Sequence, residues 1–99
     1  MGAGEPTRGA VSAVAKVVMY ATGVCPFCLM AERLLRSRGV AEIEKVRVDL
    51  DLERRDEMVR RTGRRTVPQI YVGDRHVGGY DDLAALDRAG GLEPLLATP

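Results

Sequence analysis

Apolar residues follow two spacings along the chain, and each spacing predicts one kind of secondary structure. Short apolar runs and strict alternation are typical of strands, whereas apolar residues three or four positions apart are typical of helices. The pattern predicts four strands, which cover residues 16–20, 42–49, 67–72 and 75–77. It predicts three helices, at residues 27–38, 52–62 and 81–88, with Pro26 at the first position of the first helix.

The order of the predicted elements, β-α-β-α-β-β-α, restricts how they can pair. A first β-α-β unit favours parallel strands, whereas a turn at Gly73 and Asp74 favours an antiparallel hairpin. We therefore predict an α/β fold with one mixed four-stranded sheet flanked by three helices. Residues 1–15 are predicted to be a flexible N-terminal tail and residues 16–99 the folded domain. The segment through Leu96 could add one further turn packed on the core.

Length and composition narrow the class of protein. With 99 residues, 45% of them hydrophobic, the chain is expected to form one ordinary globular domain. No apolar run approaches the ~20 residues of a membrane span, and the start lacks the basic head and apolar block of a signal peptide. No long apolar stripe is left outside the core. We therefore expect a soluble, cytoplasmic monomer with no membrane partner.

The charged residues give no global bias. The formal net charge is +1, so no nucleic acid is expected as a partner. Thirteen of the fifteen basic residues are Arg, and several stand in adjacent pairs. We interpret most of these pairs as a solvated face. Arg65 is the exception, because it precedes a candidate ligand segment and could bind a carboxylate through two parallel hydrogen bonds.

The two cysteines suggest redox chemistry through their spacing in Cys25-Pro26-Phe27-Cys28. A thiolate attacks a disulfide, so a nucleophilic cysteine needs a lowered pKa. Cys25 would lie just before a helix, whose free N–H groups and dipole stabilise a negative sulfur. Cys28, one turn further along, would be less exposed and would close an intramolecular disulfide as the resolving thiol.

Two other interpretations of the cysteine pair are weaker. An inert pair of core cysteines does not fit a cysteine at an exposed helix start. A zinc site needs about four ligands. After the two cysteines only His76 is an obvious candidate, so no metal site is predicted.

Two further segments could bind a ligand. In Thr66-Val67-Pro68, a cis peptide bond before Pro68 would turn the Val67 backbone outward to pair with an extended peptide. An ordinary edge-strand proline explains this segment equally well. The segment 78–82 could let a ligand approach its glycines and offer helix N–H groups to a carboxylate. A hairpin exit followed by an N-cap explains it too.

Together these segments resemble the glutaredoxin family, of the dithiol bacterial type. The resemblance rests on Cys25-Pro26-Phe27-Cys28, residues 62–70 and residues 78–83, and it runs from about Lys16 to Leu96, nearly the whole folded chain. It implies a thioredoxin-like fold and a glutathione-dependent thiol–disulfide oxidoreductase that reduces protein disulfides and glutathione mixed disulfides. Its partners would be glutathione, as reductant and co-substrate, and disulfide-containing or glutathionylated proteins.

The resemblance also implies roles by position. Cys25 would be the nucleophile and Cys28 its resolving partner. Glutathione would be bound by Phe27, Arg65, Thr66, Val67, Pro68, Gln69, Gly79, Tyr80, Asp81 and Asp82. Within this set the Val67 backbone would pair with the cysteinyl part and Pro68 would be cis. Residues 80–82 would hold the γ-glutamyl end, while Arg65 and Gln69 would lie near the glycyl carboxylate.

The sequence departs from the family at two positions that bear on the chemistry. Thr22 stands where many relatives have a lysine three residues before the first cysteine. Its absence predicts weaker glutathione affinity, a higher Cys25 pKa, or a substitute cation such as Arg65. Tyr80 replaces a residue that is often cysteine, so one extra redox site is missing.

Two alternative functions stay open. Because of Thr22, the chain could be a small redoxin that takes electrons from thioredoxin reductase or from mycothiol. It could also carry a [2Fe–2S] cluster, since two chains could each supply Cys25 and one glutathione thiol to make four thiolates. Pro26 and Cys28 argue against the cluster as its main role.

Overall fold

The computed structural model describes residues 15–98 of the chain. The predicted flexible tail at residues 1–15 therefore lies outside the described residues, apart from Ala15. The N–H of Ala15 donates to the carbonyl of Leu96 at 3.0 Å, so the two ends of the described chain lie side by side. Within these residues, no helix has the length and apolar character that crossing a bilayer requires.

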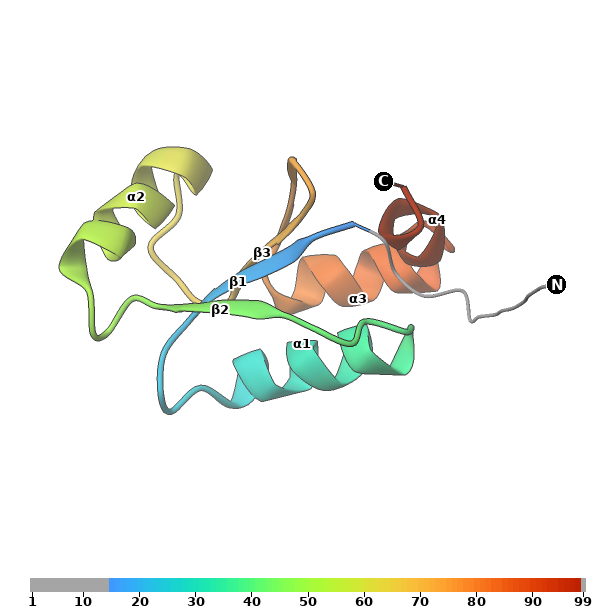
Figure 1. The fold of residues 1–99 in the computed structure, drawn as a ribbon, viewed down its shortest axis with the longest axis horizontal. Coiled ribbons are helices and arrows are strands. Elements are labelled where there is room, and N and C mark those ends of the chain that lie inside the picture. The colour runs from blue at the N-terminus through green and yellow to red at the C-terminus, as the bar shows by residue number, and fades with distance from the viewer. Residues whose placement is uncertain (1–14, 99) are drawn as a thin grey trace, which may run out of the picture.

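In the described part of the chain, four strands form one mixed sheet in the order β2-β1-β3-β4 (Figure 1). β1 (Val17–Ala21) pairs in parallel with β2 (Glu44–Arg47) and antiparallel with β3 (Gln69–Val72). β3 then pairs antiparallel with β4 (Arg75–Gly78). This pairing confirms the predicted sheet, because the β-α-β unit is parallel and the later pair is a hairpin.

The same residues form four helices, which cover both faces of the sheet (Figure 1). α1 (Pro26–Ser37) and α3 (Tyr80–Arg88) lie on one face, and α2 (Leu52–Thr62) lies on the other. A short fourth helix, α4 (Leu92–Leu96), forms where the sequence left room for one turn. The three longer helices agree with the predicted ones to within one residue at each end.

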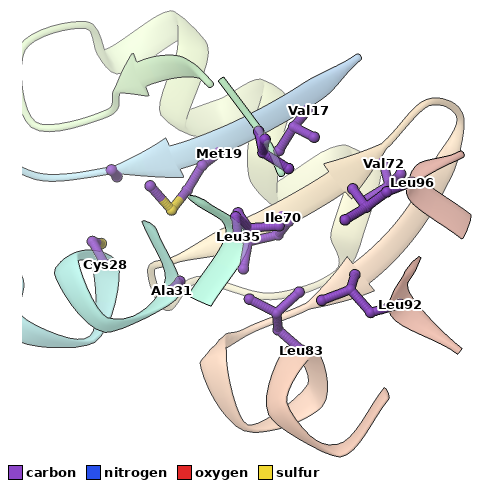
Figure 2. Close-up of a cluster of buried hydrophobic side chains, with 12 residues drawn as sticks. Val17, Met19, Cys28, Ala31, Leu35, Ile70, Val72, Leu83, Leu92 and Leu96 are labelled. Atoms are coloured by element: carbon purple, nitrogen blue, oxygen red, sulfur yellow. The ribbon is translucent and has the colours of Figure 1, made fainter. Parts of the chain in front are cut away.

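Each face of the sheet buries its own core, because successive residues of a strand point to opposite faces. Met19 of β1 enters the cluster beneath α1 and α3, which Figure 2 shows, whereas Tyr20 enters the cluster beneath α2. The larger cluster receives Leu35 from α1 and Leu83 from α3, both fully buried. Cys28 belongs to the same cluster. One of the two cysteines is thus fixed in the core beside the sheet.

Candidate active site

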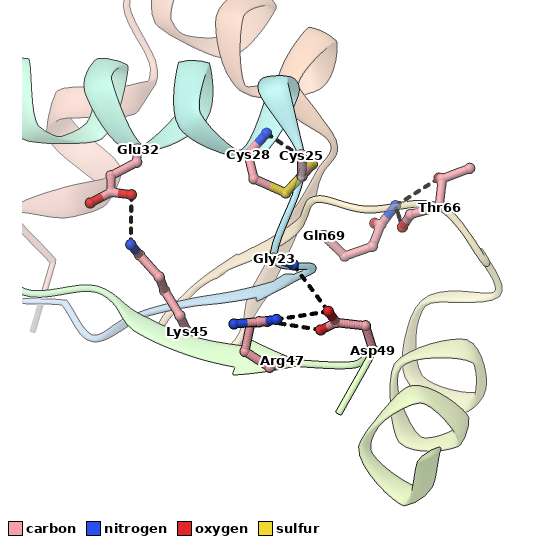
Figure 3. The surroundings of a disulfide bond; sticks show 9 residues. All are labelled: Gly23, Cys25, Cys28, Glu32, Lys45, Arg47, Asp49, Thr66 and Gln69. Atoms are coloured by element: carbon pink, nitrogen blue, oxygen red, sulfur yellow. Dashed lines mark hydrogen bonds and ion pairs between the residues drawn. A yellow bond between two sulfur atoms is a disulfide. The ribbon is translucent and has the colours of Figure 1, made fainter. Parts of the chain in front are cut away.

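Cys25 and Cys28 form a disulfide at the N-terminus of α1, with their Cα atoms 5.2 Å apart (Figure 3). Cys25 is the N-cap residue of the helix, and its Sγ accepts a hydrogen bond from the Cys28 N–H at 3.1 Å. Pro26 at the first helical position has no N–H to satisfy. Cys25 is partly exposed, whereas Cys28 is 5% exposed. In the reduced protein, this N–H and the helix dipole favour a negative sulfur on Cys25.

A groove of about 240 Å³ lies on the Phe27 side of the cysteine turn. Nine of the ten predicted binding residues line it, and they come from three segments: Phe27, residues 66–69 and residues 79–82. The ring centroids of Phe27 and Tyr80 are 6.3 Å apart, so the two rings form an aromatic edge to the groove. The fold therefore brings together residues that are distant in the sequence.

Asp82 and Arg64 both line this groove and form an ion pair at the start of α3. Arg64 Nη1 and the Gly79 N–H each donate to Asp82 Oδ2 at 2.9 Å. The Arg64 guanidinium, followed by the Gly79 N–H, lowers the pKa of Asp82, so this carboxylate stays ionised. The preceding Gly78 has a φ of 118°, and a Cβ at that position would overlap the Asp82 side chain. Glycine is required there for the strand and the helix to approach.

The basic residue at the groove is Arg64, and the structure does not bring the predicted Arg65 to it. Arg65 is exposed and lies outside the groove lining. Both arginines follow Gly63, which ends α2 in the left-handed conformation with a φ of 72°. The direction of the chain after that turn decides which of the two reaches Asp82. The residue pattern alone could not distinguish them.

Gln69 lines the groove, but its side-chain amide is already engaged and only 1% of the residue is exposed. Its Nε2 donates to the carbonyl and the hydroxyl of Thr66 at 3.1 and 3.3 Å, and its Oε1 lies 2.7 Å from His76 Nε2. Burial, followed by the charge of Arg64, lowers the pKa of His76, so the ring is neutral at pH 7. A neutral ring protonated on Nε2 donates to Gln69.

His76 is therefore a supporting residue that the sequence analysis considered only as a metal ligand. It holds Gln69, and Gln69 in turn holds Thr66 at the groove. The available signal was the position of His76 on the returning strand of the hairpin, opposite Tyr71 and close to Gln69.

The segment before β3 leaves a backbone group beyond the paired part of the sheet. The register between β1 and β3 ends at the pair of Tyr20 and Gln69, so Val67 lies past the last rung of the ladder. The peptide bond between Val67 and Pro68 is cis, which is one of the two alternatives left open by the sequence. Val67 lines the groove, and its backbone, which lies past the paired part of the sheet, is available to pair with an extended peptide.

A second hollow, of about 180 Å³, opens on the other side of the cysteine turn. We call it the pocket, and it shares no lining residue with the groove. Its buried lining comes from Cys28 and from Met19 and Ala21 of β1, and three charged residues also line it: Glu32, Lys45 and Arg47. Both cysteines and Leu29 also line it, as does Thr22, the residue that replaces the family's lysine. Both cysteines therefore line the pocket, whereas neither of them lines the groove.

Ion pairs border the pocket along β2 (Figure 3). Glu32 of α1 accepts from Lys45 at 2.7 Å and from Arg36 at 2.9 Å, and these two cations lower the pKa of Glu32. Arg47 binds Asp49 through two parallel hydrogen bonds of 2.8 Å, which hold the pKa of Asp49 well below its usual range. The two cations of β2 are thus each matched by a carboxylate.

This arrangement can perform thiol–disulfide exchange. A thiol that caps a helix can attack a disulfide, and a second, buried thiol one turn away can displace the product. Among residues 15–98, no group of three or more His, Cys, Asp and Glu side chains is placed to hold a metal ion.

Comparisons with known proteins agree with this geometry. A family model described as Glutaredoxin matches residues 17–77. The chain is also 47% identical over 83 residues to Glutaredoxin 3 of Escherichia coli (strain K12), an alignment that covers 84% of this chain and 99% of that protein.

Solved structures have the same architecture. The solution structure of glutaredoxin from Brucella melitensis matches with a TM-score of 0.76 at 40% identity, covering 90% of this chain and 96% of that one. The crystal structure of a buckwheat glutaredoxin–glutathione complex matches with a TM-score of 0.75 at 26% identity, covering 85% of this chain and 78% of that one. The thioredoxin-like fold implied by the resemblance is confirmed.

Proposed function

Because the chain belongs to the glutaredoxin family and its Cys25–Cys28 pair makes it a dithiol thiol–disulfide oxidoreductase, we propose that its reductant is glutathione, bound in the groove. The charge pattern of the groove carries this proposal. Glutathione has two carboxylates and one ammonium group, and the groove offers the Arg64 cation, the Asp82 carboxylate and the N-terminus of α3. We propose the cytoplasm as its compartment, because a pair reduced in every cycle needs reducing surroundings.

The groove residues divide the recognition of glutathione among them. The N–H groups at the start of α3 and the Asp82 carboxylate suit the γ-glutamyl end, which carries both an ammonium and a carboxylate. The Val67 backbone suits the central peptide unit. Arg64 suits a carboxylate, although it would have to share its charge with Asp82. The partner that is proposed thus matches each kind of polar group in the groove.

In the first branch of the reaction, Cys25 alone is needed. The Cys25 thiolate attacks the glutathione sulfur of a protein–glutathione disulfide, and the electron pair of the broken bond leaves with the protein sulfur, which takes up a proton. Cys25 is then disulfide-bonded to glutathione. A second glutathione thiolate attacks that glutathione sulfur, forms glutathione disulfide and releases the Cys25 thiolate.

In the second branch, Cys25 attacks one sulfur of a protein disulfide and forms a mixed disulfide with it. Cys28 loses its proton and attacks Cys25 Sγ, which forms the bond shown in Figure 3. The protein leaves with two thiols, because the sulfur released first takes up a proton from water and the sulfur released second takes the proton from Cys28. Two electrons have moved to the substrate, and two glutathione molecules then reduce the enzyme.

The test is the reduction of a small glutathione mixed disulfide by glutathione, coupled through glutathione reductase to the oxidation of NADPH. We expect activity in the wild type, none in Cys25→Ser, and most of the activity retained in Cys28→Ser. Cys28→Ser should lose the reduction of protein disulfides. This pattern follows because only the second branch uses the Cys28 thiol.

The same assay with other donors tests the alternatives. If glutathione gives no turnover while mycothiol or thioredoxin reductase does, the proposed donor is wrong and the oxidoreductase chemistry stands. If Cys28→Ser and Cys25→Ser lose the glutathione-coupled activity equally, the first branch is wrong.

A further inference from the structure

The start of α1 stabilises a negative charge on Cys25, but Cys28 also has to become a thiolate. In the second branch Cys28 loses its proton before it attacks Cys25 Sγ. Cys28 is 5% exposed, and burial disfavours a charged sulfur. The Cys28 N–H is already donated to Cys25 Sγ at 3.1 Å. A thiolate on Cys28 therefore depends on charges elsewhere around it.

The pocket brings charged side chains to the same hollow as Cys28. Glu32 and Lys45 both line it together with the two cysteines. Glu32 follows Cys28 by four residues, so the two side chains lie on one face of α1, one turn apart. Lys45 stands opposite Met19 in the parallel pair of β1 and β2, and opposite residues point to the same face of a sheet. Since Met19 is buried beneath α1, Lys45 extends toward α1 and reaches Glu32 at 2.7 Å (Figure 3).

The cations around the pocket outnumber the carboxylates that bind them. Arg47 and Asp49 form a pair of one cation and one anion, joined by two hydrogen bonds of 2.8 Å. The Glu32 carboxylate, in contrast, is shared between Lys45 and Arg36, so this cluster has a surplus of one positive charge. Arg36 lies further along α1 and outside the pocket lining. Lys45 is therefore the cation of the cluster that lies at the pocket.

The charged residues on the other side of the cysteine turn line the groove, which neither cysteine lines. They are Arg64 from the loop after α2 and Asp81 and Asp82 from α3. Arg64 and Asp82 pair with each other at 2.9 Å. Glu32 and Lys45 are thus better placed than these groups to act on Cys28.

We propose that Lys45, held against α1 by Glu32, is a positioning residue that stabilises the Cys28 thiolate in the resolving step. The inference rests on the second branch of the proposed function and adds a residue to it. Lys45 neither gains nor loses a proton, because the proton of Cys28 still passes to the substrate sulfur that is released. As the bond between Cys28 and Cys25 forms, the bond between Cys25 and the substrate breaks. The cation acts on the negative sulfur that exists before this exchange.

Glu32 has two opposing effects on Cys28. It holds Lys45 in place, but its own negative charge disfavours a thiolate one turn away. Loss of the Lys45 charge and loss of the Glu32 charge should therefore change the Cys28 thiolate in opposite directions. A pair that only ties α1 to β2 would respond in the same direction to the loss of either partner.

The experiment is a stopped-flow reaction of the full chain, reduced beforehand and freed of reductant, with one equivalent of dipyridyl disulfide. Cys25 attacks the reagent and releases one pyridinethione, and Cys28 then attacks Cys25 Sγ and releases the second. The two phases of absorbance therefore report the two cysteines separately. The reagent is uncharged at neutral pH, so the charge of Lys45 does not attract it.

The second phase should depend on the charge at position 45. In Lys45→Met we expect it to be about twofold slower at pH 7, with the midpoint of its pH profile raised by about half a unit. At high pH the variant should be no slower than wild type, because a thiolate of higher pKa is the stronger nucleophile. Lys45→Arg, which keeps the charge, should behave as wild type.

Two more variants complete the test. Glu32→Gln keeps an oxygen that can accept from Lys45 but loses the negative charge. Its second phase should be about twofold faster at pH 7, with a lower midpoint. The matched control is Lys16→Met, which breaks the pair of Lys16 and Glu44 at 2.9 Å outside both hollows. It should leave both phases unchanged.

Three outcomes would overturn the proposal: a slower second phase in both Lys45→Met and Glu32→Gln, an unshifted pH midpoint in Lys45→Met, or an equal change in the first phase. The first two would make the pair a structural tie, and the third would assign Lys45 to Cys25. A wild type without a second phase would contradict the second branch itself. The reaction contains no glutathione, so a wrong donor would show only in the coupled assay and leave this result standing.

Discussion

The groove and the pocket lie on opposite sides of one cysteine turn, and they differ in the chemistry they offer. The groove presents carboxylates, a guanidinium and a helix N-terminus, whereas the pocket presents both cysteines, a buried floor of Met19 and Ala21, and charged residues at its border. The charges beside the pocket, on Lys45 and Arg47, are already matched by carboxylates. The two sides of one cysteine turn therefore differ in the chemical groups they can bind.

The largest effect on one side alone is expected from removing the Asp82 carboxylate of the groove. Asp82→Ala should raise the KM for a glutathione mixed disulfide by about tenfold or more, because it removes the carboxylate proposed to bind the ammonium group of glutathione and the acceptor of the Gly79 N–H. The rate at which a small alkylating reagent reacts with Cys25 of the reduced chain should change little, because Asp82 lines the groove and the cysteines do not. Steady-state kinetics of the coupled assay give the KM, and the alkylation rate gives the reactivity of Cys25.

A matched control exists on the same helix. Asp87 pairs with Arg38 through two hydrogen bonds, and it lines neither hollow. Asp87→Asn should leave the KM unchanged. An equal loss of Cys25 alkylation in Asp82→Ala would show that Asp82 acts on Cys25 or on the fold rather than on glutathione.

A smaller effect is expected from Gln69, which holds Thr66 at the groove. Gln69→Leu removes the amide that holds Thr66 and leaves the His76 ring without its acceptor. We expect a free energy of unfolding lower by about 1–3 kcal/mol and a KM for the mixed disulfide higher by about fivefold. Urea unfolding and the coupled assay measure the two quantities.

A direct contact between Gln69 and glutathione would give a different result from support through Thr66. If Gln69 contacted glutathione directly, Gln69→Leu would raise the KM without lowering the free energy of unfolding. Its 1% exposure makes that result unexpected.

Adding a charge on the pocket side tests how that side affects the reactivity of Cys25. Thr22→Lys places a cation beside both cysteines, where the present chain has a hydroxyl. A nearby cation favours the thiolate, so alkylation of reduced Cys25 should extend to lower pH and become about threefold faster at neutral pH. Thr22→Met, of similar length and uncharged, is the control. An equal increase in both variants would mean that side-chain bulk, not charge, produces it.

The smallest effect is a pH dependence that belongs to the groove side. Burial, and then Arg64, lowers the pKa of His76 from 6.5, with Asp82 opposing and Arg61 adding to the shift. The unfolded chain therefore binds a proton more readily than the folded one, and stability rises with pH. The free energy of unfolding should fall as pH decreases below 6.5. Above pH 6.5 the ring is neutral in both states, so His76 should add no pH dependence there.

The His76→Gln variant tests this assignment. It should show a flatter pH dependence of unfolding between pH 6.5 and the onset of carboxylate protonation. Asp82 also has a lowered pKa, but it titrates from 3.8 downward and so acts in a separate range. An unchanged slope in the variant would assign the dependence to other groups.

The elements that sequence predicts well are those with local signals. The bounds of α2 agree with the prediction because Asp51 accepts from the N–H groups of Glu53 and Arg54, and Gly63 takes the left-handed conformation. β2 is shorter than predicted, at Glu44–Arg47 instead of 42–49, because a strand ends where its partner ends. The partner strand is distant in the chain, so no local pattern shows this limit.

The same division applies to the site. The cysteine turn follows from its spacing, and nine of the ten predicted binding residues lie together as the family resemblance implies. Arg64 was missed because it and Arg65 are equivalent in the pattern and differ only in the direction of the chain after Gly63.

The hydrogen bond from the Cys28 N–H to Cys25 Sγ makes the backbone of α1 a sensor of the sulfur. An amide proton that donates to a sulfur responds to the charge on that sulfur, so the NMR signal of this single amide would follow the ionisation of Cys25 in the reduced protein. It would also distinguish the thiolate from the disulfide and from a sulfur bonded to glutathione. The NMR signal of the Cys28 amide would thus report each state of the catalytic cycle.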